Sequence, residues 1–189
     1  MSAGIILTQL PGVWERCALE ALGDSGGELE CYSAAEGAPS AAVVQYFDSD
    51  VQNAKLGAMP VCDDLSTRFV ARLLSDTGPV DISGPILMIV AFDVPDDAVA
   101  EVERWYAEEH IPMLMRAPGW LRARRYQTIS LAGAKRFTSI ALHELRELEV
   151  LGSEERRLAR STDWRARLEQ NLWFQQAGRF VYRRMAKAE

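Results

Sequence analysis

An apolar run that leads directly into a helical pattern is the feature that most constrains this chain. Residues 86–94 (ILMIVAFDV) are rich in β-forming residues, and Pro95 with the two aspartates behind it supplies the chemistry that starts a helix. Apolar residues recur at helical spacing from Ala98 to about Met115, so we expect an amphipathic helix over that range. The second half of the chain therefore opens with a strand followed by a helix.

Proline interrupts this helix within the stretch WYAEEHIPMLMRAPGW, residues 105–120. Pro112 cannot donate to the carbonyl of Glu108 and its ring crowds that carbonyl, so we expect the helix to kink or change direction there. His110 lies at the break. A kink leaves backbone acceptors free, which is how a polar pocket can open beside an apolar helix, and the Ala-Pro-Gly that follows ends the helix.

The rest of the second half continues with two strands, two short helices and a last strand. The expected strands are Trp120–Ser130, Arg136–Leu148 and Phe174–Met185, and the expected helices are Ser153–Arg160 and one opened by Ser161, Thr162 and Asp163. A Leu-Ala-Gly-Ala turn separates the first two of these strands. The order is β-α-β-β-α-β, which is that of a ferredoxin-like unit.

The first half follows the same plan in shorter form. Its expected strands are Gly4–Leu10, Glu28–Ala34 and Ala41–Phe47, with helices at Val13–Leu22 and Val51–Leu56 and a closing strand or helix at Thr67–Leu74. AAVVQYFDSD aligns by pattern with TSIALHELRE and puts Tyr46 opposite His143. With the turn-rich segment Asp76–Gly84 as linker, we expect a degenerate ferredoxin-like repeat over residues 1–80 and a second repeat over residues 86–189.

Two ferredoxin-like units in one chain predict an α+β fold with a closed barrel. Each unit has helices on one face of its antiparallel sheet and leaves the other face bare, so the two bare faces can pack together into an α/β barrel. A single chain would then form what smaller relatives need a dimer to make. We expect either a monomer of this pseudo-dimeric kind or a homodimer.

The net charge argues against nucleic-acid binding, which needs a basic surface. The formal charge is −6, and the first 85 residues hold four basic and twelve acidic side chains. We interpret arginine runs such as Arg156, Arg157 and Arg160 as solvated faces and ion pairs. The N-terminus lacks a signal-peptide pattern, no run approaches the roughly 20 apolar residues of a membrane span, and the three cysteines show no C-x-x-C spacing. We therefore expect a cytoplasmic protein with reduced thiols and no membrane partner.

Three motifs in the second half carry a resemblance to a known family. They are W-x(4)-H-[IV]-P in the helix, the Pro-Gly-Trp turn after it, and the arginine-rich strand LRARRY. With the later STDW and FVYRRM, residues 86–185 resemble the EthD-like branch of the dimeric α/β-barrel superfamily, whereas residues 1–80 match it by topology only. Its members include cofactor-independent monooxygenases, polyketide cyclases, lactone isomerases and decarboxylases, and some bind haem, so the resemblance implies a fold more firmly than a reaction.

The sequence has two histidines, His110 and His143, and each has two interpretations. An imidazole with a pKa near neutrality makes His110 a candidate general acid/base, and the alternative is that it caps backbone carbonyls and keeps the helix bent. His143 shares a strand face with Ser139 and Ala141, whose small side chains leave room either for a ligand or for a packed helix. We take both histidines as candidate catalytic residues.

The arginines of strand 120–130 offer a way to hold an anion. Arg125 lies on one face of that strand and Arg124 and Tyr126 on the other, so one set should face inward. An inward arginine can hold a carboxylate, enolate or phenolate, and the alternative for each is an ion pair with Glu144 or with an acid of the helix. Arg125 and Tyr126 are candidate catalytic residues, and Arg124 is a candidate substrate-binding residue.

Aromatic and methionine side chains near His110 can wall a pocket for an aromatic substrate, with core packing as the alternative for each. The other candidate substrate-binding residues are Trp105, Tyr106, Met113, Trp120, Trp164 and, from the first half, Tyr46.

Together with the resemblance, which implies chemistry of this kind, these residues predict a cofactor-independent enzyme that acts by proton transfer on a small hydrophobic substrate. The substrate is an aromatic or polyketide-like carbonyl compound, and the reaction is cyclisation, decarboxylation or isomerisation. A cofactor-free monooxygenase is one alternative, and a non-catalytic protein that binds a small molecule is another. No metal site is expected because no carboxylate motif accompanies the two histidines. Binding of haem through a single histidine stays an open alternative.

Overall fold

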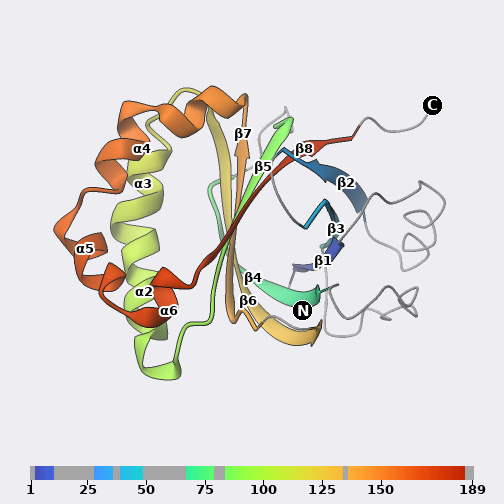
Figure 1. Cartoon of the computed structure of the whole chain (residues 1–189), viewed down its shortest axis with the longest axis horizontal. Helices are drawn as coiled ribbons and strands as arrows, with labels where there is room; N and C mark the ends of the chain where they lie inside the picture. The colour runs from blue at the N-terminus through green and yellow to red at the C-terminus, as the bar shows by residue number, and fades with distance from the viewer. Residues whose placement is uncertain are drawn as a thin grey trace.

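In the part of the chain that the structure describes, eight antiparallel strands close into one barrel (Figure 1). The computed structural model describes residues 3–10, 28–35, 39–48, 67–78, 84–133 and 136–185. The strands are β1 Gly4–Leu10, β2 Glu28–Ala34, β3 Ala41–Phe47, β4 Thr67–Asp76, β5 Ile86–Phe92, β6 Trp120–Gly133, β7 Ser139–Leu145 and β8 Gly178–Arg184. They follow one another around the barrel as β1-β3-β2-β8-β5-β7-β6-β4.

Each half of the chain contributes four neighbouring strands in the same order. The first half forms β4-β1-β3-β2 and the second forms β8-β5-β7-β6, so the first strand of each half lies between its fourth and its third. The halves meet where β4 pairs with β6 and where β2 pairs with β8. The expected α+β barrel of two ferredoxin-like units is therefore confirmed.

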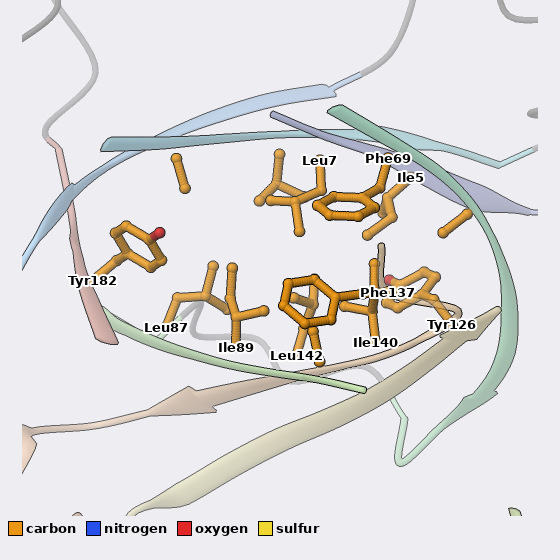
Figure 2. Close-up of a cluster of buried hydrophobic side chains, with 14 of the residues drawn as sticks. Ile5, Leu7, Phe69, Leu87, Ile89, Tyr126, Phe137, Ile140, Leu142 and Tyr182 are labelled. Atoms are coloured by element: carbon orange, nitrogen blue, oxygen red, sulfur yellow. The ribbon is translucent and has the colours of Figure 1, made fainter. Parts of the chain in front are cut away.

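Strand β5 is buried on both faces, which explains its continuous apolar sequence. Leu87 and Ile89 point into the barrel (Figure 2), while Met88 and Phe92 pack toward the helices. The barrel interior is filled by apolar side chains from both halves, among them Ile5, Leu7, Phe69, Tyr126, Phe137, Ile140, Leu142 and Tyr182. Burying one leucine or isoleucine contributes about 1.5 to 3 kcal/mol, so this interior is a stabilising core.

Helices cover the outer face of the second half of the barrel (Figure 1). They are α2 Val99–Trp105, a π turn Tyr106–His110, α3 Ile111–Leu114, α4 Glu154–Ala159, α5 Asp163–Glu169 and α6 Leu172–Gln175, with short 3-10 helices at Asp96–Ala98 and Leu148–Gly152. The hydroxyls of Ser153 and Thr162 cap the N-termini of α4 and α5, as serine and threonine do when they precede a helix. Among the described helices, none is long and apolar enough to cross a membrane.

The helix expected from Ala98 to Met115 continues through Pro112 by means of the π turn. The N–H of Ile111 donates to the carbonyl of Tyr106, five residues back, and the backbone at His110 and Ile111 is right-handed helical. A π turn widens the helix by one residue, which accommodates a proline that lacks an N–H. The break expected at Pro112 therefore takes the form of a turn that ends at His110.

Several boundaries differ from those expected. Strand β6 runs on to Gly133 because its last residues pair with the start of β4, and the segment Thr67–Leu74 belongs to a strand. The segment expected as the strand Phe174–Met185 begins as helix α6, with β8 starting at Gly178, and β7 is shorter than expected. The expected helices Val13–Leu22 and Val51–Leu56 lie outside the described residues, as does most of the linker.

Candidate functional site

A cavity of about 100 Å³ lies between the outer face of the second-half sheet and the helices that cover it. Both histidines line it, His110 from the π turn and His143 from β7. Aromatic side chains from both layers line it as well, namely Phe92, Trp105, Tyr106, Trp120 and Phe174. The structure thus brings together five candidate residues from separate elements: His110, His143, Trp105, Tyr106 and Trp120.

The contacts of His110 define which of its ring nitrogens carries the proton. Its ring stacks on that of Trp105, with 4.3 Å between the centroids, and Nδ1 lies 3.2 Å from the carbonyl oxygen of Ala159. A carbonyl can only accept a hydrogen bond, so Nδ1 of His110 is the donor. Nε2 of the neutral ring therefore carries the lone pair.

His143 has the opposite tautomer. Nε1–H of Trp120 donates to Nδ1 of His143 across 3.2 Å, so that nitrogen holds the lone pair and the neutral ring carries its proton on Nε2. The side chain is 1% exposed. Among the residues that the structure describes, neither Nε2 has a hydrogen-bond partner. The cavity therefore holds one imidazole that can accept a proton and one that can donate a hydrogen bond.

Burial keeps both imidazoles uncharged. It lowers the pKa of His110 to about 3, and positive charge on Arg165, Arg125 and Arg156 acts in the same direction. Burial also lowers the pKa of His143 to about 3, and His110, Arg125 and Arg156 act in the same direction. Both rings are thus neutral near pH 7.

Arg125 lies on the helix side of β6, beside the cavity. Its guanidinium carbon lies 3.5 Å from the centroid of the Tyr106 ring, and its Nη2 donates to Glu103 and to Ser139, each at 2.7 Å. The sequence left two roles open for Arg125, binding of an anionic substrate or an ion pair with an acid of the helix. The structure shows the ion pair, with Glu103. Arg125 packs against the ring of Tyr106, which lines the cavity, and so supports the cavity wall.

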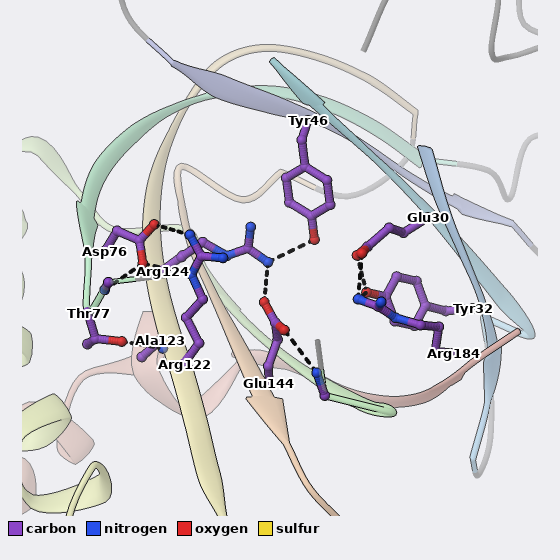
Figure 3. A network of polar contacts seen from close by, with 12 residues as sticks. Glu30, Tyr32, Tyr46, Asp76, Thr77, Arg122, Ala123, Arg124, Glu144 and Arg184 are labelled. Carbon is purple, nitrogen blue, oxygen red and sulfur yellow. Dashed lines mark hydrogen bonds and ion pairs between the residues drawn. The ribbon is translucent and has the colours of Figure 1, made fainter. Parts of the chain in front are cut away.

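Arg124 and Tyr46 lie on the other side of the sheet, inside the barrel (Figure 3), and Tyr126 lies in the barrel interior as well (Figure 2). Nη2 of Arg124 donates to the hydroxyl of Tyr46 at 2.9 Å and to the carboxylate of Glu144, which is the ion-pair alternative for this arginine. Burial raises the pKa of Tyr126 to about 12, so its hydroxyl stays protonated. Arg124, Tyr46 and Glu144 form a polar network inside the barrel, and Tyr126 packs in the same interior, so these residues are separate from the cavity that holds His110.

Met113 and Trp164 do not line the cavity. Met113 packs with Leu114 and Trp120 in the apolar layer between the helices and the sheet. The Trp164 indole donates to Glu101 at 3.2 Å, and Arg104 lies over its ring at 5.5 Å. Trp164 is half-buried at the edge of the apolar cluster between the helices and the sheet, outside the lining of the cavity.

Four arginines line the cavity: Arg156, Arg160, Arg165 and Arg179. The sequence indicates a solvated face for Arg156 and Arg160 and does not single out Arg165 or Arg179. They come from α4, from the residue that follows it, from α5 and from β8. Arg156 and Arg160 are four residues apart, a spacing that puts both on one face of a helix and was the available signal. The other two join them only through the tertiary fold.

Solved structures match the whole of this chain, whereas no family model and no curated protein matches its sequence. An anthrone oxidase-like protein aligns over 98% of this chain and 92% of its own, with 10% identity and a TM-score of 0.69. A monooxygenase-like protein from Listeria innocua aligns over 99% and 96%, with 8% identity and a TM-score of 0.61. A heme-degrading enzyme from Listeria monocytogenes aligns over 96% and 98%, with 8% identity and a TM-score of 0.58.

This chain shares the α/β-barrel fold of these three proteins. At such low identity the likeness shows the fold alone, so the EthD-like branch, the tandem duplication and the division at the linker stay predictions. Among the described residues, no group of three or more His, Cys, Asp or Glu side chains is placed to hold a metal ion.

Proposed function

We propose that this protein is an enzyme that removes a proton from a small aromatic carbonyl or phenolic compound without a cofactor. The observation that carries the proposal is the pair of buried imidazoles in opposite tautomers, His110 and His143, in one aromatic-walled cavity. Buried ionisable groups in a pocket are strong candidates for catalysis, and a base must present a lone pair to the proton it takes.

His110 is the base in this proposal, and His143 stabilises the charge that develops. Nε2 of His110 accepts the proton, and the Ala159 carbonyl stabilises the resulting imidazolium through Nδ1–H. Nε2–H of His143 donates to the substrate oxygen on which negative charge gathers. A general base contributes about 10²- to 10⁴-fold in rate, and a donor aimed at a developing oxyanion about 10²- to 10³-fold.

Molecular oxygen is the reaction partner that the structural neighbours favour for the carbanion, because they are named monooxygenase-like and anthrone oxidase-like. Oxidation of a ring CH₂ group to a carbonyl takes four electrons from the substrate, consumes one O₂ and releases one water. Cyclisation, decarboxylation or isomerisation would begin with the same proton transfer and consume no oxygen.

Haem fits this cavity poorly. A cavity of about 100 Å³ is smaller than the roughly 300 to 1,000 Å³ of pockets that hold drug-sized ligands, and haem belongs at the upper end of that range. The ring of His110 is stacked on Trp105, which fixes its plane among packed aromatic side chains. The proposed reaction therefore takes no step through haem.

Replacement of His110 tests the proposed base. The probes are a panel of single-ring aromatic carbonyl and phenolic compounds, and the reaction is followed by deuterium exchange into the substrate and by oxygen uptake. We expect His110→Gln to lower both rates by about 10²- to 10⁴-fold while the circular dichroism spectrum is kept. Trp164→Phe is the matched control, since Trp164 packs outside the cavity, and it should retain activity.

Three outcomes separate the alternatives. Undiminished turnover by a folded His110→Gln protein contradicts the assignment of the base. Deuterium exchange without oxygen uptake favours isomerisation or a related reaction over oxygenation. Tight binding of a probe with neither product nor exchange, unchanged in His110→Gln, supports a binding protein in place of an enzyme.

A further inference from the structure

The cavity of the two histidines is lined by positive charge that no lining carboxylate balances. Arg156, Arg160, Arg165 and Arg179 face it, and no aspartate or glutamate is among the described residues that line it. Arg165 has a partner in Glu169, at 2.8 Å, which lies outside the lining. The lining therefore carries an excess of at least three positive charges.

These positive charges are partly buried, and buried positive charge is unfavourable unless a negative charge lies nearby. Arg165 is 6% exposed, and its Nη1 donates to the backbone carbonyl of Arg160 at 2.8 Å, which fixes its direction. Burial lowers the pKa of Arg156, and the charges of Arg160, Arg165 and Arg179 lower it further. Like charges held this close create a strong local attraction for an anion.

Apart from the arginines and histidines, the residues that line the cavity are apolar or aromatic, and the cavity volume limits the ligand to one ring. An engineered apolar cavity of about 150 Å³ binds benzene, so a cavity of about 100 Å³ has room for at most one aromatic ring, and the ligand's polar end has to reach the opening. Arg160 and Arg179 are exposed, which places the opening beside them. Guanidinium groups bind planar carboxylates through two parallel hydrogen bonds.

We propose that the ligand of this cavity is a small aromatic carboxylate, with its charged group among the four arginines and its ring against the aromatic wall beside His110. The inference rests on the proposed function and names the substrate class. It also gives the substrate a role in catalysis. A carboxylate among the arginines offsets the positive charge around His110, so His110 becomes a stronger base when the substrate is bound.

Benzoate and benzamide test the proposal, because they have the same size and ring and differ in charge. Each is titrated into the full chain, with binding followed by calorimetry and by tryptophan fluorescence. We expect benzoate to bind at least tenfold more tightly than benzamide, and we expect its affinity to fall as salt is added. The double variant Arg160→Gln/Arg179→Gln should lose at least tenfold in benzoate affinity and less than twofold in benzamide affinity.

Arg167→Gln is the control, since Arg167 is an exposed arginine of α5 that does not line the cavity. It should change neither affinity by more than twofold. Equal affinity for benzoate and benzamide, no saturable benzoate binding below about 10 mM, or equal losses for both probes in the double variant would each overturn the proposal. Inorganic sulfate that binds as tightly as benzoate would overturn its aromatic part.

Binding is measured here without turnover, which separates this test from that of the base. If His110→Gln retains activity while benzoate binds selectively, the proposed base fails and the anion site stands. If benzoate does not bind selectively while His110→Gln is inactive, the base stands and the substrate class fails.

Discussion

The two histidines differ in which ring nitrogen the protein holds, and that difference assigns their roles. A backbone carbonyl fixes His110 as a donor at Nδ1, and the indole of Trp120 fixes His143 as an acceptor at Nδ1. Exchange of these two partners would reverse which ring can take a proton. The hydrogen-bond partners, more than the imidazoles themselves, therefore define the proposed chemistry.

The titration of the imidazoles is a prediction at this scale. Because burial and nearby arginines hold both pKa values at about 3, the rings should stay neutral as the pH falls from 8 to about 4.5. Nitrogen-15 NMR of the ligand-free protein measures this directly, and added benzoate should raise the pKa of His110. A histidine that titrates near 6.5 in the free folded protein would contradict the expectation.

Both histidines and most of the aromatic residues of the cavity wall were predicted from the sequence. That four arginines come together at the same cavity was not predictable. The two faces of strand β6 are equivalent in sequence, so only the closed barrel decides that Arg125 faces the helices and Arg124 the interior. Arg179 lies 69 positions after His110, and its place at the cavity follows from the pairing of β8 with β5. Local patterns carry no information about such a meeting.

At the scale of elements, one hydroxyl joins the π turn to helix α5. Oγ1 of Thr162 accepts from the backbone N–H of Arg165 at 3.2 Å, and it donates to the carboxylate of Glu109 at 2.6 Å. The same residue therefore caps the helix that carries a cavity arginine and holds it against the turn that carries His110.

Removal of this hydroxyl should loosen the cavity as well as the helix. We expect Thr162→Ala to lower the free energy of unfolding by about 1 to 2 kcal/mol, as loss of an N-cap does, and to weaken benzoate binding by several-fold. Urea denaturation and calorimetry measure the two effects. Ser161→Ala removes a neighbouring exposed hydroxyl and serves as the control. A loss of stability with unchanged benzoate affinity would show that Thr162 acts on the helix alone.

The elements themselves were largely predictable because their periodicity is strong. The strands Gly4–Leu10, Glu28–Ala34 and Ala41–Phe47 have the expected bounds. Helix α6 was missed because Phe174 is apolar and buried, which suits a strand as well as a short helix. The sequence indicated a break at Pro112, but the choice of a π turn depends on how the widened helix packs on the sheet.

At the scale of the whole molecule, the two seams between the halves differ in extent. Strand β4 pairs with β6 over nine residue pairs, whereas β2 pairs with β8 over three. The shorter seam is reinforced by side chains, since Arg184 of β8 donates to the carboxylate of Glu30 and to the hydroxyl of Tyr32 on β2 (Figure 3). Glu30 is buried, and the hydroxyl of Tyr32 also donates to its carboxylate, at 2.5 Å.

Arg184→Met should therefore weaken the barrel. We expect a loss of about 2 kcal/mol in the free energy of unfolding, below the range for fully buried pairs because Arg184 is partly exposed. The double variant Glu30→Gln/Arg184→Met should recover at least half of that loss, because it leaves no buried carboxylate without a cationic partner. Arg183→Met, at an exposed neighbouring position, should stay within about 0.5 kcal/mol. Unchanged stability in Arg184→Met by urea denaturation would rule out this role.

A barrel made from one continuous chain can have two different outer faces, whereas a barrel made from two identical chains cannot. Two identical chains related by a two-fold axis must carry the same residues on both outer faces. Here both histidines belong to the second half, so the two faces differ in composition. Ligand titrations should accordingly saturate at one equivalent per barrel with a simple hyperbolic curve, and each face can change in evolution without altering the other.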